Sequence, residues 1–238
     1  MSPDVFSPSL GIREDGFGNP IGKAVPDWAG CQRLPDVVLA GRTCRVVPYA
    51  VEFSEGLLAA YAKGDGGLFS YLTWGPFGSA GEIDAMVRDY MDHRGFQTFV
   101  IVTADGPVGL ASFMRYDEGS GSVEIGGLTF SPLLQRTTAA TEAMYLMMRH
   151  AFEGGYRRYE WKCDQLNAPS KRAAERLGFV FEGVFRNAVV TKGRRRDTAW
   201  YSVIVEEWPA VRERLEAWLQ PENFDKSGIQ KRALTTGS

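Results

Sequence analysis

The chain has 238 residues, with 27 basic and 29 acidic side chains and a formal net charge of −2. This balance argues against binding nucleic acid by neutralising many phosphates, and no apolar run approaches the roughly 20 residues of a membrane span. Three widely spaced cysteines and two histidines argue against a disulfide scaffold and a His/Cys metal cluster. We therefore expect a cytoplasmic globular protein without metal, membrane or nucleic-acid partners.

Residues 1–36 are rich in Gly, Pro, Asp and Asn and lack periodicity, which predicts an irregular N-terminal arm. A single domain is expected from residue 37 to residue 220. It begins with a strand at Val37–Val47, which a short turn interrupts. A helix is expected next, from about Phe53 to Lys63.

An aromatic cluster with the sequence FSYLTWGPF occupies residues 69–77. Trp74 and Phe77 could line a substrate mouth, and core packing is the alternative for both. A helix is predicted directly afterwards. Ser79 is its candidate N-cap, and apolar residues recur at i, i+3, i+4, i+7 and i+8 from Ile83.

From Thr98 the pattern changes to strands. Two apolar segments flank Ala104-Asp105-Gly106, and Asp-Gly supports the positive-φ turn that β-hairpins favour. A further strand, SVEIGGLTF, contains Gly126 and Gly127. Adjacent glycines in a strand mark a bulge or the close approach of another backbone. Residues 98–130 are therefore expected to form an antiparallel meander.

The meander leads into a polar turn, Gln135–Thr138, and an apolar helix that stops at Gly154-Gly155. The N–H groups and the positive dipole end at a helix start point the same way, which suits an anion. The turn is thus a candidate site for a phosphate-bearing ligand. An ordinary strand–helix connection is the alternative.

A short strand is expected at Tyr159–Cys163. The next helix starts at Asn167-Ala-Pro-Ser170 and ends at Gly178. Two strands, Phe179–Ala188 and Thr198–Val205, should flank a basic turn at Lys192–Asp197. A last helix carries Trp208 and Trp218, and the polar residues 221–238 are expected to form a mobile tail.

This order of elements, together with four motifs, resembles the GCN5-related N-acetyltransferase superfamily, in particular the branch of the ribosomal-protein N-terminal acetyltransferases. The motifs are ATEA at 140–143, NAPSKRAAERLGF at 167–179, EGVFR at 182–186 and KGRRRD at 192–197 with Tyr201-Ser202. The resemblance implies an α/β fold. It has a single mixed, twisted sheet with helices on both faces, and its central parallel strands (residues 123–130 and 159–163) splay around acetyl-CoA.

The resemblance also implies site residues. The pantetheine arm would pair with the backbone of Leu128, Thr129 and Phe130, and Asn167 would contact it. The pyrophosphate would lie on Gln135, Arg136, Thr137, Thr138, Ala139 and Ala140. Relatives usually carry glycines where this chain has Arg136 and Thr138, so side-chain donors would have to replace the close backbone approach that glycine allows.

Direct acetyl transfer to an amine needs a base for the ammonium proton and a donor for the departing thiolate, but no covalent intermediate. Glu124 and Asp164 are candidate bases, with a plain surface carboxylate as the alternative for each. The resemblance places Ser170 near the thiol. Arg186 is a candidate for attracting an acidic substrate or the cofactor's 3′-phosphate, and a buried Cys163 is expected to be inert.

The sequence therefore predicts an acetyl-CoA-dependent N-acetyltransferase that acts on a primary amine, either a protein N-terminus or a small amine. A homodimer is a candidate assembly. The alternative is a non-catalytic acyl-CoA-binding or regulatory domain, in which the glycine-free turn is degenerate. Release of the CoA thiol distinguishes the two.

Overall fold

A computed structural model describes residues 13–234. Residues 1–12 of the expected arm and residues 235–238 of the expected tail lie outside the described residues. By its internal contacts the chain divides into residues 1–30 and residues 31–238. In the first unit, β1 (Arg13–Glu14) and β2 (Pro20–Ile21) form a small antiparallel ribbon.

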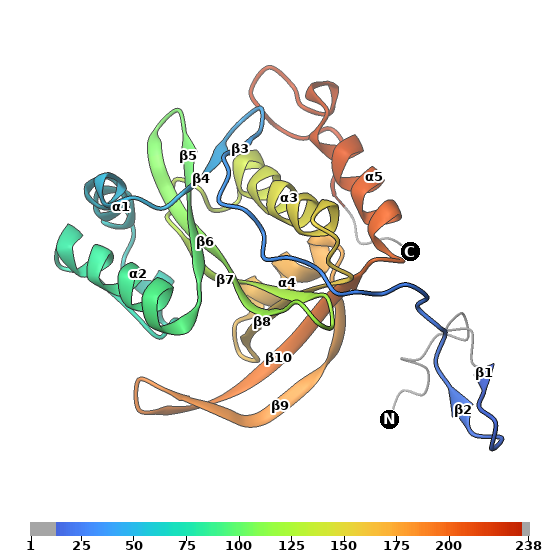
Figure 1. Cartoon of the computed structure of the whole chain (residues 1–238). Coiled ribbons are helices and arrows are strands. Elements are labelled where there is room, and N and C mark those ends of the chain that lie inside the picture. The colour runs from blue at the N-terminus through green and yellow to red at the C-terminus, as the bar shows by residue number, and fades with distance from the viewer. Residues whose placement is uncertain (1–12, 235–238) are drawn as a thin grey trace. The chain divides into compact units, whose positions relative to one another are not determined.

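The second unit contains an eight-stranded sheet in the order β3-β4-β5-β6-β7-β8-β10-β9 (Figure 1). Among the described strands only β7 and β8 pair in parallel, so the mixed sheet expected from the sequence is confirmed. The strands are β3 (Leu39–Ala40), β4 (Arg45–Pro48), β5 (Gln97–Thr103), β6 (Gly106–Asp117), β7 (Ser122–Phe130), β8 (Arg158–Asp164), β9 (Val180–Thr191) and β10 (Arg194–Ile204).

Helices cover both faces of this sheet (Figure 1). One core joins α1 and α2 to one face, and a larger core joins α3, α4 and α5 to the other. No helix of the described part is long and apolar enough to cross a membrane. The helices are α1 (Ser54–Tyr61), α2 (Ala80–Arg94), α3 (Thr138–Glu153), α4 (Ala168–Leu177) and α5 (Trp208–Leu219).

Local sequence signals set the first and last residues of the helices where the sequence predicts. The Ser79 hydroxyl accepts a hydrogen bond from the Glu82 N–H at the start of α2. Asn167 Oδ1 accepts from the Ser170 N–H at the start of α4. Gly178 has φ +104 at the end of α4, a left-handed conformation that suits glycine.

The glycine pair of β7 forms the expected bulge. Gly127 has φ +63, and the pairing with β6 slips by one residue between Gly126 and Thr129. The parallel ladder between β7 and β8 stops at Ile125 and Trp161, although both strands continue. The two strands therefore separate beyond the bulge.

Two features of the C-terminal third differ from the sequence-based expectation. The basic turn of the β9–β10 hairpin comprises only Lys192-Gly193, since Arg194 already pairs with Thr191 and cross-strand pairing extends both strands. Residues 221–234 are also not the free tail expected. Asn223 is buried because its amide bonds to the backbone of Trp218 and Arg232, and Leu234 is buried because it packs in the larger core.

Candidate active site

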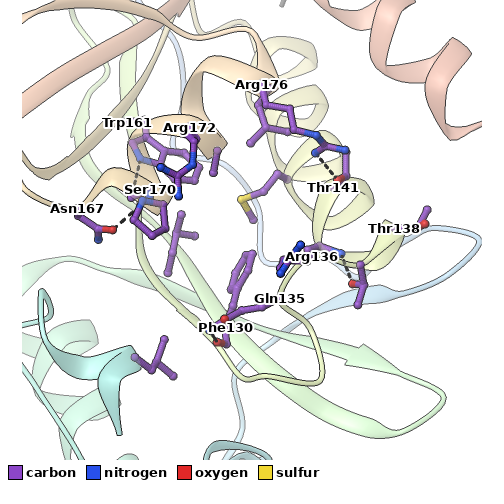
Figure 2. Close-up of a pocket in the computed structure, with 18 of the residues that line it drawn as sticks. Phe130, Gln135, Arg136, Thr138, Thr141, Trp161, Asn167, Ser170, Arg172 and Arg176 are labelled. Carbon is purple, nitrogen blue, oxygen red and sulfur yellow. Dashed lines mark hydrogen bonds between the residues drawn. The ribbon is translucent and has the colours of Figure 1, made fainter. Parts of the chain in front are cut away.

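A cleft of about 1220 Å³ opens where β7 and β8 separate. Its lining comes from the segment before α2 (residues 65–72), the end of β7, the turn before α3, the N-terminal half of α3, the length of α4 and the C-terminal segment, with Trp161 of β8. Figure 2 shows Gln135 and Arg136 on one side of this cleft and Asn167, Ser170 and Arg172 on the other. The elements that the sequence singled out thus meet in one cavity.

The turn before α3 is held by its own side chains. Gln135 Nε2 donates to the Phe130 carbonyl at 2.7 Å. Thr137 Oγ1 accepts from the Ala140 N–H at 3.2 Å and donates to the Leu134 carbonyl at 2.7 Å, so Thr137 is the N-cap of α3. The N–H groups of Thr138 and Ala139 belong to the first helical turn, where no intrahelical acceptor exists.

Arg136 stands in the left-handed region at φ +64, and its side chain is exposed at the cleft. This is one of the two positions at which the resemblance to the acetyltransferase superfamily led us to expect a glycine. A non-glycine residue at such a φ costs roughly 1 kcal/mol. The chain therefore keeps the backbone shape of a glycine turn and adds a guanidinium to it.

The start of α4 forms the opposite wall. Trp161 Nε1 donates to Ser170 Oγ at 3.0 Å, which makes the hydroxyl an acceptor toward the indole. The Ser170 proton is therefore not used in this bond, and the Cys163 thiol is one acceptor within its reach. Asn167 also lines the cleft, and its Oδ1 caps the helix, so its Nδ2 donors are not used by the cap.

Two arginines of α4, Arg172 and Arg176, also line the cleft. The sequence analysis did not assign them to the site. Arg176 Nη1 donates to Thr141 Oγ1 at 2.9 Å, and its guanidinium lies 4.8 Å from the Trp218 ring centre. Burial and the neighbouring Arg214 both lower the pKa of Arg176. Their i, i+4 spacing in the motif at 167–179 could have predicted this, because it puts Arg172 and Arg176 on the same face of the helix as each other.

Glu124 lies on the other face of the sheet. Its neighbours Val123 and Ile125 belong to the core with α3, and alternate strand residues point to opposite faces. Lys162 Nζ donates to Glu124 Oε2 at 2.9 Å and to Glu160 Oε2 at 2.7 Å, and Arg115 is 3.2 Å from Glu124. Burial raises the pKa of Glu124, and Lys162 and Arg115 oppose that rise.

The other two groups considered for chemistry have local roles. The Asp164 carboxylate accepts from the Leu166 N–H at 2.9 Å, in the turn after β8, and does not line the cleft. Cys163 is buried. Burial raises the pKa of its thiol although a hydrogen bond from Ser170 lowers it, so the thiol stays protonated near neutral pH.

The expected substrate contacts separate into three environments. Trp74 Nε1 donates to Thr129 Oγ1 at 3.2 Å, beside the bulge, and its ring packs edge-on against Tyr90. Phe77 is partly buried and packs on Tyr61 and Phe69 at the edge of the core with α1 and α2. Arg186 is exposed on β9 and does not line the cleft.

The β9–β10 hairpin is fastened across the sheet. Lys192 Nζ donates to the carbonyls of Phe69, Trp74 and Gly75 at 2.8 to 3.0 Å. Arg194 Nη2 donates to the Ser70 carbonyl at 2.9 Å. These bonds tie the motif that resembled the family to the aromatic loop, so the hairpin bounds the face on which Glu124 lies.

The cleft therefore gathers most of the residues expected to bind the cofactor. Two of them, Thr129 and Ala139, are buried and do not line the cleft. The chemistry of the rest fits acetyl-CoA. An apolar floor of Leu128 and Phe130 suits pantetheine, and cationic and N–H donors at Arg136, Arg172 and Thr138 suit phosphates.

Comparison with known proteins gives one match to a family model. The model is described as acetyltransferase (GNAT) domain, and it matches residues 58–180. No curated protein gives a match.

Solved structures are also similar. A GCN5-related N-acetyltransferase from Brucella melitensis is 40% identical, with a TM-score of 0.84 over 88% of this chain and 97% of its own. A probable acetyltransferase of the GNAT family from Chromobacterium violaceum is 33% identical, with a TM-score of 0.74 over 80% and 98%. RimL, a ribosomal alpha-N-protein acetyltransferase, shares the fold at 18% identity and a TM-score of 0.61 over 71% and 94%.

Proposed function

Because the chain belongs to the GNAT acetyltransferase family and is thus an acyl-CoA-dependent N-acetyltransferase, we propose that it transfers the acetyl group directly to a primary amine. In this proposal Ser170 faces the thioester sulfur and Glu124 serves the amine. The acceptor is a protein N-terminus or a small amine. A cytoplasmic location and a homodimer stay predictions.

The observation that carries the proposal is the gap between β7 and β8. Ser170 lies at the cleft on the α3 side of the sheet, and Glu124 lies on the opposite face, within the same two-strand unit. An amine that approaches from the Glu124 face meets the thioester at this gap. Bound acetyl-CoA supplies the activated acetyl group.

Each side chain then has one task. The ammonium first loses one proton to Glu124 through water, which frees the nitrogen lone pair. The bond between nitrogen and the acetyl carbon then forms, the carbon–sulfur bond breaks, and the second nitrogen proton passes to the departing sulfur. The Ser170 hydroxyl, which already accepts from Trp161, donates to the departing sulfur. Donors aimed at a developing negative charge stabilise the transition state more than the ground state. No covalent enzyme intermediate is required.

The direct test is a screen of acceptors that follows CoA thiol release. Peptides with free N-termini form one arm, and amino acids, polyamines and other small amines form the other. Turnover in one arm identifies the acceptor class. Acetyl-CoA binding without thiol release in either arm would contradict the proposal.

Ser170→Ala is expected to lower kcat roughly 10- to 100-fold, because a donor to the leaving sulfur acts mainly in the transition state. The dissociation constant for acetyl-CoA should stay within about twofold of the wild-type value. Asn167→Ala is the comparison: it removes a helix cap worth about 1 kcal/mol and should weaken acetyl-CoA binding. Unchanged kcat in folded Ser170→Ala would remove Ser170 from the mechanism.

Arg136→Gly separates the side chain from the turn. Glycine adopts φ +64 without strain, so the free energy of unfolding should change by no more than about 1 kcal/mol. The dissociation constant for acetyl-CoA, measured by calorimetry, should rise roughly tenfold through loss of a charge-assisted contact.

Asn187→Gly is the matched control, since Asn187 also has a positive φ of 53° but does not line the cleft. It should leave acetyl-CoA binding unchanged. Equal affinity of wild type and Arg136→Gly would mean that the backbone alone binds the phosphates.

A further inference from the structure

The C-terminal segment forms a closed loop at one end of the cleft. Asn223 holds its base, because Nδ2 donates to the carbonyls of Trp218 and Arg232 and Oδ1 accepts from the Arg232 N–H. The Lys231 N–H donates to the Asn223 carbonyl as well. Between these closures, residues 228–230 reach the cleft and line it.

This loop is joined to the cleft wall through Trp218. Trp218 Nε1 donates to Gln230 Oε1 at 2.9 Å, and Phe224 packs edge-on against the same indole at 5.1 Å. The guanidinium of Arg176 lies over the Trp218 ring. Ile229 remains 65% exposed, an apolar side chain at the rim of a cleft that also carries charge.

The charge at this end is positive. Arg176 lines the cleft here, and Arg172 lines it one helical turn earlier on α4, toward Ser170. Among the described residues, the contacts of the Arg176 guanidinium are a hydroxyl and an indole, not a carboxylate. Arg214 donates to the Arg176 carbonyl, and Arg42 lies over Phe224. A partly buried guanidinium without a carboxylate partner favours an anionic ligand.

We propose that this loop, residues 223–232, together with Arg172 and Arg176, binds the nucleotide end of the acyl donor. The apolar atoms of Ile229 would pack against the adenine, and the two arginines would take the 3′-phosphate. The inference rests on the proposed function for the identity of the donor. It makes the loop the element that distinguishes a full CoA thioester from a donor that carries pantetheine alone.

The first test is binding of adenosine 3′,5′-bisphosphate, which needs no acetyl transfer. Calorimetry should show binding to wild type. Ile229→Asp should weaken it roughly tenfold, because it removes the apolar contact with the adenine and adds a negative charge near the phosphates. Ile229 is exposed, so this variant should keep the wild-type melting temperature.

Ser227→Asp is the matched control, since it adds the same charge to the same loop at a residue that does not line the cleft. Its affinity for the bisphosphate should stay within about threefold of wild type. Absence of bisphosphate binding to wild type, or equal weakening in both variants, would overturn the assignment.

The second measurement uses turnover. The ratio of kcat/KM for acetyl-CoA to kcat/KM for S-acetyl-pantetheine should fall roughly tenfold in Ile229→Asp. An unchanged ratio would contradict the proposal. If wild type binds the bisphosphate but releases thiol from neither donor with any acceptor, the transferase proposal fails while the nucleotide site stands.

Discussion

Glu124→Gln is expected to lower kcat/KM about 100-fold or more, because a positioned general base contributes on the order of 10² to 10⁴ in rate. Burial raises the pKa of Glu124, with Lys162 and Arg115 opposing, so its ionisation should lie above the usual 4.5. The base works as the carboxylate. Wild-type activity should therefore fall as pH drops through this raised pKa. This acidic fall in the pH–activity profile should be missing from Glu124→Gln.

Glu160→Gln provides the control. Glu160 shares Lys162 with Glu124, so both substitutions remove one negative charge beside the same ammonium. Burial acts to raise the pKa of Glu160, but hydrogen bonds from Lys162 and Arg158 outweigh it and keep the pKa below its usual value. Equal losses in both variants would show that the charge around Lys162 matters, and that Glu124 is not the base.

Glu142→Gln is expected to lower the free energy of unfolding by about 3 kcal/mol, as loss of a buried charged hydrogen-bond acceptor does. The Glu142 side chain leaves α3 and caps the turn between β3 and β4. It accepts from the N–H groups of Arg42 at 2.8 Å, Thr43 at 2.6 Å and Cys44 at 3.2 Å. An amide can present only one oxygen and would set its NH₂ against these donors.

The pH dependence gives this prediction its signature. Burial would raise the pKa of Glu142, but the hydrogen bonds from Thr43, Arg42 and Cys44 outweigh it and hold the pKa below the usual 4.5. A carboxyl group whose pKa is lower in the folded than in the unfolded state stabilises the fold at a pH above its unfolded-state pKa. This stabilisation is lost as the pH falls through the folded-state pKa. The difference between wild type and variant should thus be largest above pH 4.5 and shrink below it.

Urea denaturation across pH measures the effect. Glu153→Gln is the matched control, because Glu153 lies on the same helix, is exposed, and reaches Arg149 and Arg212 only at 3.9 and 3.7 Å. It should cost less than about 0.5 kcal/mol. If Glu142→Gln lowers the free energy of unfolding at neutral pH by no more than the control does, the capping role is contradicted.

The elements of this protein follow from local sequence. Ser79 and Asn167 cap helices, and Gly178 ends one, because each signal acts on backbone groups within a few residues. Gly126-Gly127 predicted the bulge for the same reason. The polar turn at Arg136 could likewise be placed at the head of α3, although its left-handed backbone was not visible in the sequence.

Tertiary structure decided what these elements bring together. Glu142 stands in a motif that resembles the family, yet its partners lie about 100 residues away in the β3–β4 turn. Glu124 was a candidate base, but only strand pairing set Lys162 and Glu160 against it. Such contacts depend on how distant strands pair, and no local pattern carries that information.

The C-terminal segment shows the same limit most clearly. By composition residues 221–238 predict a mobile tail, since local patterns count polar side chains as solvent-exposed. In the structure Asn223 turns its amide to the backbone of Trp218 and Arg232, which closes a loop, and Leu234 is buried. In the sequence, a polar residue that will bond to backbone groups across a loop cannot be distinguished from one that will be exposed to solvent.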